Sequence, residues 1–268
     1  MTTRIFPVSE AVRRAPYNFP DAPPKEDVND YLFLSVPGYP PALIRHLGRP
    51  DTTAVMAGIY ISQELPATQR GLFYPDLVIA FDIDMEAIIA RKGFVINEQG
   101  KPPDFVLEVG SETTGRRDVG AKREGYAALG IPEYWRFDPS GGLYHRSPSL
   151  PGAALAGDRL VNGRYEPFPI HRTDEGDYRG HSGVLNLELR WESGSLLWFD
   201  PVEQLYLPSY DEAIDVAEGR RIAAEGRRVA AEEQRDAAME QRAAAEARVR
   251  ELEDQLRRLQ NPGQTETP

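Results

Sequence analysis

The pattern of apolar and polar positions divides the chain into four stretches. Residues 1–50 are rich in proline and show little periodicity, which indicates an irregular arm with one short helix near Pro41–Leu47. From residue 51 to about 208, short apolar runs alternate with turn residues, a pattern typical of a domain built on strands. Residues 209–260 contain no proline and predict a long helix, and the tail 261–268 is expected to be disordered.

Four apolar runs in the second stretch predict the strands of a sheet. The near-continuous apolar character of the first three runs indicates strands that are covered on both faces. A helical segment, residues 111–130, joins the last two runs, so these two strands are expected to be parallel with a right-handed crossover. Short strands from Gly142 to Leu207 predict antiparallel hairpins that close the sheet edge. The four runs are Thr53–Ile61, Tyr74–Phe81, Phe105–Val109 and Glu133–Asp138.

The long helix carries a seven-residue repeat. A second apolar position, Val249 and Leu256, joins the repeat only near its end, so the final part is predicted to be coiled coil. The alanine-rich middle suits a solvated helix arm as well as self-association. The repeated position is occupied by Ala217, Ala224, Ala231, Ala238, Ala245, Leu252 and Leu259.

Composition narrows the class of protein. The 268 residues contain no cysteine, which excludes disulfides and thiolate sites. No apolar run approaches the roughly 18 residues of a membrane span, and the opening residues lack a signal-peptide core, so a soluble cytoplasmic protein is expected. A formal net charge of −11 argues against general DNA coating, but it leaves room for a local basic cleft or a partner that supplies affinity.

Two acids stand in or beside the strand candidates. Asp76 directly precedes the apolar run Leu77–Phe81, and Glu108 interrupts Phe105–Val109. Ionised carboxylates are rarely buried without a partner or a metal, and pairing with an arginine is the plainer alternative. On adjacent strands, the two carboxylates would form an oxygen-rich site suited to Mg²⁺ or Mn²⁺.

Polar residues in the following helix share one side of it. The plainer interpretation of this spacing is a solvated ion pair between residues 118 and 122, worth a few tenths of a kcal/mol. Arg116 and Arg117 weaken that interpretation, because cations near a helix N-terminus oppose its dipole unless an anion such as phosphate sits there. The residues spaced four apart are Thr114, Asp118, Lys122 and Tyr126.

These residues together resemble a known family. The pattern closely resembles the Uma2 family, restriction-endonuclease-like proteins in the PD-(D/E)xK nuclease superfamily. The similarity is specific over roughly Tyr74–Asp138 and extends to the hairpins up to about Leu207. The matching positions are Pro75-Asp76, Glu108-Val109, Ser111, Thr114, Asp118, Lys122, Tyr126 and the run Gly130–Trp135 with Asp138.

The resemblance implies an α/β fold and a site. The fold would be a mixed-sheet, restriction-endonuclease-like core over residues 51–208. Asp76 and Glu108 would bind Mg²⁺ or Mn²⁺ together with the backbone carbonyl of Val109. Lys122 would replace the signature lysine, because Gly110 stands where that lysine normally lies. Ser111, Thr114, Asp118 and Tyr126 would support these groups.

Two functions follow from this pattern. The first is a metal-dependent endonuclease that cleaves DNA, and the alternative is a non-catalytic scaffold that oligomerises through its C-terminal helix. The acid that many of these nucleases carry on an N-terminal helix is not assigned, and Glu64 is merely nearest in sequence. Trp135 is expected in the core. The four histidines lack metal-ligand spacing and are expected to be solvated or hydrogen-bonded: His46, His145, His171 and His181.

Overall fold

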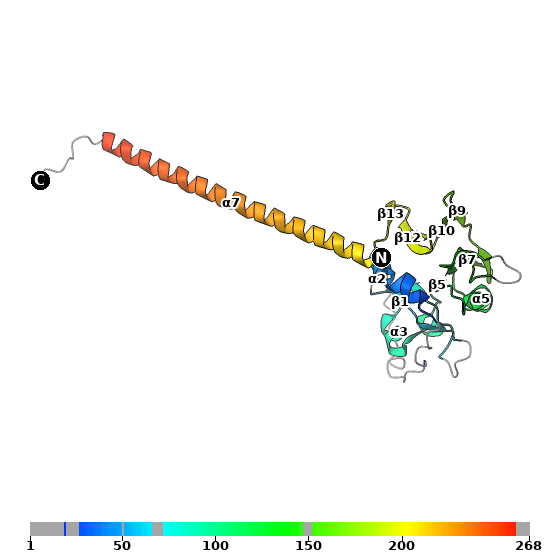
Figure 1. Cartoon of the computed structure of the whole chain (residues 1–268). Coiled ribbons are helices and arrows are strands. Elements are labelled where there is room, and N and C mark those ends of the chain that lie inside the picture. The colour runs from blue at the N-terminus through cyan, green and yellow to red at the C-terminus, as the bar shows by residue number, and fades with distance from the viewer. Residues whose placement is uncertain (1–18, 20–26, 50, 66–71, 147–151, 261–268) are drawn as a thin grey trace. The chain divides into compact units, whose positions relative to one another are not determined.

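The computed structural model describes residues 19, 27–49, 51–65, 72–146 and 152–260. The predicted disordered tail and most of the proline-rich arm lie outside the described residues. The chain forms two compact units, Met1–Asp211 and Glu212–Pro268. The first unit contains the sheets and the shorter helices, and the second consists of the long helix α7 beyond its first two residues (Figure 1).

A six-stranded mixed sheet organises the first unit, with the strand order β1-β3-β5-β6-β7-β8. Strands β5 and β6 run parallel, as the strand–helix–strand pattern predicts, and the other four pairings are antiparallel. The strands are β1 (Thr53–Ala57), β3 (Leu77–Phe81), β5 (Phe105–Val109), β6 (Glu133–Phe137), β7 (Leu155–Val161) and β8 (Arg164–Pro167).

The later hairpins are antiparallel, as predicted, and they do more than close an edge. Strands β7 and β8 extend the mixed sheet, whereas the remaining hairpins form a five-stranded sheet of order β13-β12-β11-β10-β9. A small parallel pair, β2 and β4, completes the unit. These strands are β2 (Tyr60–Ser62), β4 (Gly93–Val95), β9 (His171–Arg172), β10 (Tyr178–Ser182), β11 (Leu187–Glu192), β12 (Ser195–Asp200) and β13 (Leu205–Tyr206).

Seven helical elements accompany the strands among the described residues. Helix α2 matches the helix predicted near Pro41–Leu47, with proline in its first turn. They are η1 (a π-helical turn, Tyr31–Ser35), α2 (Tyr39–Leu47), α3 (Met85–Arg91), α4 (Ile96–Gln99), α5 (Gly115–Val119), α6 (Ala121–Ala128) and α7 (Tyr210–Gln260).

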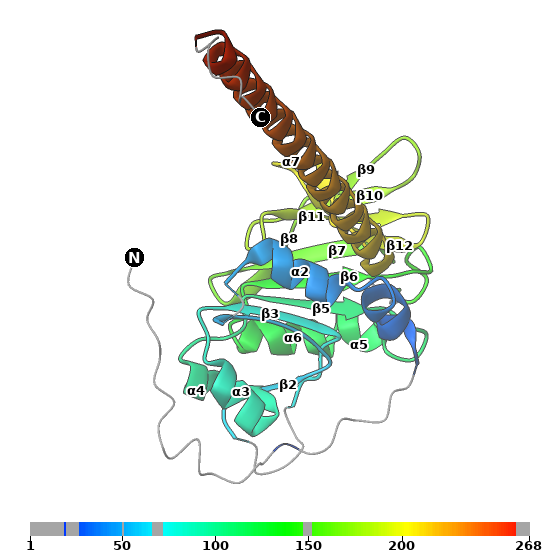
Figure 2. The same cartoon turned by 90° about the vertical axis from the view of Figure 1, so that its left-hand side faces the viewer.

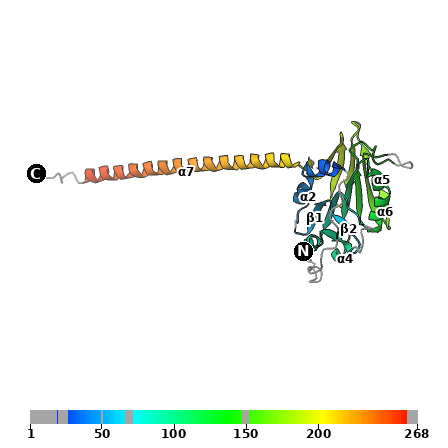
Figure 3. The same ribbon diagram turned by 60° about the horizontal axis from the view of Figure 1, so that its bottom comes forward.

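Successive side chains of the central strands enter two different cores, because strand side chains alternate between faces. Leu77 and Leu107 pack in one core with the five-stranded sheet and helix α2. Val78 and Val106 pack in the other, together with Tyr126 of helix α6. Figure 3 shows α2 on one side of the strands and α5 and α6 on the other. The prediction that these strands are covered on both faces is confirmed.

Two predicted elements are each divided at a glycine. The single helix predicted for residues 111–130 is wrong, because Gly120 leaves helical geometry (φ −119°, ψ −101°) and separates α5 from α6. The single strand predicted for Thr53–Ile61 is also wrong, because Gly58 adopts φ +60° between β1 and β2. A side chain at residue 58 would be strained in that conformation.

The C-terminal helix α7 runs for 51 residues and confirms the predicted long helix. None of these described residues is buried. Its coiled-coil character stays a prediction. Within the described residues, no helix combines the length and apolar character that a membrane span requires.

Candidate active site

The two predicted acids lie beside each other on the central sheet. The antiparallel register pairs Leu77 with Leu107, so Asp76 lies one step further along, opposite Glu108. The backbone N–H of Val109 donates to Oδ2 of Asp76 at 2.8 Å. Because Glu108 alternates with its neighbours Leu107 and Val109, its side chain enters the core that α6 covers. Figure 2 shows α5 and α6 beside β5.

Glu108 is almost completely buried, at 1% exposure, and both of its oxygens have partners from helix α6. Oε2 lies 2.8 Å from Nζ of Lys122, and Oε1 accepts a hydrogen bond of 2.5 Å from the Tyr126 hydroxyl. The plainer alternative for Glu108 was pairing with an arginine, but its cationic partner is Lys122. The side chain of Lys122 keeps 20% of its surface exposed, so this end of the cluster opens to solvent.

Asp118 completes the cluster. Its Oδ1 lies 2.8 Å from Nζ of Lys122. Asp118 is fully buried, so this is not the solvated ion pair that the spacing alone allows. Its backbone carbonyl accepts a hydrogen bond of 2.9 Å from the Tyr134 hydroxyl, which fixes the end of α5 beneath the sheet. The single lysine thus bridges two buried carboxylates.

The turn from β5 into α5 is built from hydroxyl groups. Thr114 occupies the N-cap position of α5, although its side chain makes no capping hydrogen bond. Its backbone N–H instead donates to Oγ of Ser111 at 3.2 Å, and the two hydroxyl oxygens lie 2.8 Å apart. Ser111 and Thr114 therefore shape the turn that brings α5 and α6 against Glu108.

Burial and charge set the proton affinities of the cluster. Burial raises the pKa of Asp76 well above its ordinary value, and the neighbouring charge of Glu108 raises it further. Burial also raises the pKa of Glu108, although Lys122 opposes the rise. Burial by itself would lower the pKa of Lys122, but the charges of Glu108 and Asp118 outweigh it and raise that pKa. Lys122 therefore stays an ammonium ion.

Asp118 behaves differently from the other two carboxylates. Burial by itself raises its pKa, but the contact with His145 and the charge of Lys122 outweigh the burial, and the pKa of Asp118 is lowered. The anionic form of Asp118 is therefore favoured by its neighbours. Asp76 and Glu108 are the carboxylates for which a proton and a metal cation would compete.

The oxygen donors at Asp76 and Glu108 fit a hard cation. Among the described residues, no donor reaches the second oxygen of Asp76, and each oxygen of Glu108 retains a second lone pair beside its present partner. Within the same residues, no three His, Cys, Asp or Glu side chains form a ready-made cation site. Two carboxylates would leave further coordination positions to water and substrate, as Mg²⁺ favours.

The sequence pattern missed the contribution of the N-terminal segment. Asp30 stands at the N-cap of η1, and its charge adds to the raised pKa of Asp76. The neighbouring Asn29 donates through Nδ2 to the carbonyl of Gly110 at 2.9 Å. Glu64 instead accepts a hydrogen bond from Asn97. The position of Asp30 just before the apolar run Tyr31–Ser35 was a possible signal that this acid reaches the site. The proline-rich surroundings obscured that signal.

His145 is not solvated. It is buried at 2% exposure, with Nε2 3.5 Å from Oδ2 of Asp118 and Nδ1 3.9 Å from Oδ2 of Asp138. A Cβ atom at Gly110 would lie 2.7 Å from this Nε2. The ring of His145 therefore fills the space in which a lysine at residue 110 would begin.

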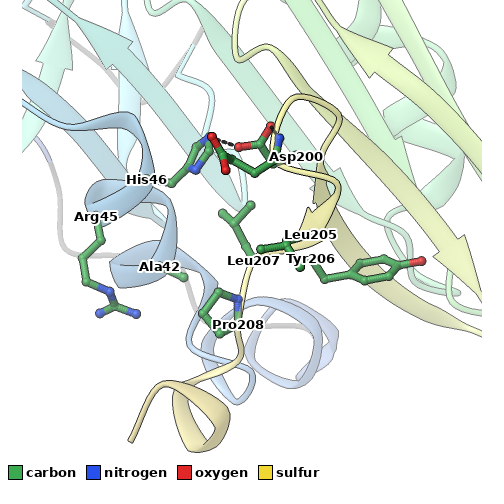
Figure 4. Close-up of a pocket in the computed structure, with 9 residues that line it drawn as sticks. Ala42, Arg45, His46, Asp200, Leu205, Tyr206, Leu207 and Pro208 are labelled. Carbon is green, nitrogen blue, oxygen red and sulfur yellow. Dashed lines mark hydrogen bonds and ion pairs between the residues drawn. The ribbon is translucent and has the colours of Figure 1, made fainter. Parts of the chain in front are cut away.

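A separate hollow of about 300 Å³ lies between α2 and the strands β12 and β13. In Figure 4, His46 faces Asp200 across this hollow, with Nε2 3.8 Å from Oδ2. Leu207 lines its wall and belongs to the core on the α2 side of the sheet. Glu108 points to the opposite side, so the hollow is not part of the acid cluster.

Comparison with known protein families gives a match. The model of the Uma2 family, described as "Putative restriction endonuclease", matches residues 43–182, more than half of the 268 residues. The matched region contains the acids, the lysine and the hydroxyl turn, whereas Asp30 lies before it. No curated protein matches the chain.

Proposed function

The chain belongs to the Uma2 family, and from this membership and its buried acid cluster we propose that it is a metal-dependent endonuclease that hydrolyses phosphodiester bonds in DNA. The observation that carries the proposal is the pair Asp76 and Glu108, which lie opposite each other, directly before β3 and in β5, and whose pKa values are both raised. Lys122 contacts Glu108 at 2.8 Å. A scaffold has no need of a half-buried and a fully buried carboxylate that repel each other.

The proposed metal ligands are Asp76, Glu108 and the carbonyl oxygen of Val109, which suit Mg²⁺ or Mn²⁺. When bound, such a metal lowers the pKa of a coordinated water and offsets charge on the scissile phosphate. Asp30 is our candidate for the acid that these nucleases carry on an N-terminal helix, because its charge already acts on Asp76. Tyr126 holds Glu108 in place through its hydroxyl.

Lys122 acts in this proposal as a cation and not as a general base, because its raised pKa keeps it protonated. An ammonium group beside Glu108 can orient the attacking water and stabilise negative charge on the phosphate. Arg116 and Arg117 are exposed on α5 and offer local positive charge to the DNA backbone. Such local positive charge would allow contact with DNA phosphates although the net charge of the chain is −11.

Cleavage of supercoiled plasmid with Mn²⁺ or Mg²⁺ tests the proposal. The wild type is expected to nick the plasmid, and Asp76→Asn, Glu108→Gln and Lys122→Met are expected to abolish nicking. Lys101→Met is a matched control, because Lys101 pairs with Asp104 just before β5, whereas Glu108 lies near the end of that strand. Nicking that survives in all three variants would refute the assignment, and cleavage of RNA alone would replace DNA as the substrate.

The unburied helix α7 favours a second candidate function, a scaffold that assembles through this helix. Its apolar residues Ile222, Val229, Leu252 and Leu256 are exposed. Light scattering on the full chain is expected to show an oligomer that Leu252→Asp with Leu256→Asp dissociates. Arg250→Asp, which adds negative charge off the apolar positions, should leave it intact. An oligomer together with no cleavage under either metal would favour this candidate.

A further inference from the structure

The loop that follows β6 is folded back onto the acid cluster by one carboxylate. Oδ1 of Asp138 accepts the backbone N–H of Ser140 at 2.9 Å. Oδ2 of Asp138 accepts the backbone N–H groups of Tyr144 and His145, each at 2.9 Å. The Trp191 indole also donates to the carbonyl of Asp138 at 2.8 Å, so the root of the loop is fixed to the second sheet. The position of His145 is thereby set by backbone contacts.

Two glycines on the opposite side make room for this loop. A Cβ atom at Gly110 would lie 2.7 Å from Nε2 of His145, and one at Gly115 would lie 2.3 Å from the carbonyl oxygen of Tyr144. Both distances are too short for a side chain to be accommodated without movement. The backbone that carries the acid Glu108 and begins α5 therefore lies directly against the loop.

The contacts continue from the loop to the lysine. Nδ1 of His145 lies 3.9 Å from Asp138, and Nε2 lies 3.5 Å from Oδ2 of Asp118. The other oxygen of Asp118 lies 2.8 Å from Nζ of Lys122, which reaches Glu108 at 2.8 Å. Along this line the groups alternate between acid and base. Within the described residues, neither ring nitrogen of His145 and neither carboxylate oxygen of Asp118 makes a hydrogen bond, so these buried groups meet through electrostatic contacts alone.

We propose that His145 is a positioning residue that holds Asp118 and, through it, keeps the Lys122 ammonium against Glu108. The role of Lys122 in cleavage rests on the proposed function above. Without a group on Oδ2, Asp118 has Lys122 on one side only, and its carboxylate is free to rotate about its side-chain bonds. Lys122 would then leave Glu108 for part of the time, because its long side chain has many rotamers.

Two substitutions separate positioning from packing. His145→Leu places an apolar side chain of similar bulk at this position and removes both ring nitrogens. His145→Gln instead places an amide N–H near the location of Nε2. His181→Gln serves as the control, because His181 is exposed on β10. With Mn²⁺, kcat for plasmid nicking is expected to fall roughly 10-fold in His145→Leu with little change in KM, and to recover in His145→Gln.

A second readout does not depend on activity. The chain has four lysines, so acetic anhydride labelling at one pH, counted per lysine by mass spectrometry, reports how firmly Lys122 is held. We expect labelling of Lys122 to rise at least about threefold in His145→Leu and to return to the wild-type rate in His145→Gln, as immobilisation of its side chain is lost and restored. Lys92 and Lys101 are internal references and are expected to keep their rates.

The possible outcomes distinguish the positioning role of His145 from the proposed nuclease activity. Unchanged labelling of Lys122 in His145→Leu, or a rise that His145→Gln fails to reverse, would overturn the positioning role whether or not the protein nicks DNA. An inactive wild type with the expected labelling pattern would instead remove the proposed nuclease and leave the positioning role standing. Should His145→Leu not fold, His145→Asn carries the same expectation, because its shorter amide stops short of Asp118.

Discussion

Gly110→Ala perturbs the packing beneath the acid cluster at one point. The added Cβ would lie 2.7 Å from Nε2, 3.0 Å from Cε1 and 3.3 Å from Cδ2 of the His145 ring. Favourable contacts between heavy atoms lie at about 3.5–4.0 Å. The ring cannot withdraw easily, because it is buried and its backbone N–H is held by Asp138. Overpacking of this kind costs about 1–3 kcal/mol of folding free energy.

Denaturant unfolding of four proteins measures this cost: the wild type, Gly110→Ala, His145→Ala and the double variant. Removal of the ring opens the space, so the penalty of Gly110→Ala should shrink by about 1 kcal/mol or more in the His145→Ala background. Backbone strain does not contribute, because Gly110 is not among the residues with positive φ. Gly183→Ala, whose Cβ would meet Glu133 at 3.6 Å, should cost little. Equal penalties in both backgrounds would refute the packing argument.

Three further substitutions test the electrostatics of the cluster in metal-free protein. Asp76→Asn should raise the melting temperature near pH 7, because a raised folded-state pKa makes ionisation of Asp76 unfavourable to folding. The gain should disappear below the ordinary pKa of 3.8, where Asp76 is protonated in both states. A gain that persists there would contradict the reasoning. Tyr126→Phe removes a hydrogen bond that lowers the pKa of Glu108. Mn²⁺ affinity, measured by calorimetry, should therefore begin to rise at a higher pH than in the wild type. Superimposable pH profiles would contradict this role of Tyr126. Lys122→Met should lower the free energy of unfolding by about 3–5 kcal/mol at neutral pH, because it leaves the buried carboxylates of Glu108 and Asp118 without their cation. A loss under about 1 kcal/mol would show that the cluster does not need this cation.

The central strands could be predicted because local pattern and tertiary role agree there. The run Phe105–Val109 is apolar at every position except Glu108, and it forms β5 with the predicted bounds. The spacing of Asp118, Lys122 and Tyr126 also survives in the fold. Gly120 interrupts the helix between the first two, yet Asp118 and Lys122 remain an ion pair four residues apart.

Residues that reach the cluster from distant segments could not be predicted in the same way. Asp30 acts on Asp76 only because η1 and α2 pack into the core through Leu34 and Leu43, and no local periodicity reveals that packing. His145 is placed by hydrogen bonds from backbone N–H groups to Asp138, which depend on how one loop closes. Glycine at both 110 and 115 was the available signal that a backbone or ring approaches the turn closely.

The register of β3 against β5 links the stability of the fold to the geometry of the cluster. The pairing of Leu77 with Leu107 buries both side chains in the core shared with the second sheet. The same pairing sets Asp76 opposite Glu108 on the other face. A slip of β3 by one residue would turn Leu77 out of that core and carry Asp76 to the face away from Glu108, because strand side chains alternate with a period of two. The apolar core therefore enforces the approach of two carboxylates whose mutual repulsion opposes it, and the free energy of leucine burial holds a cation-attracting pair in place before any cation binds.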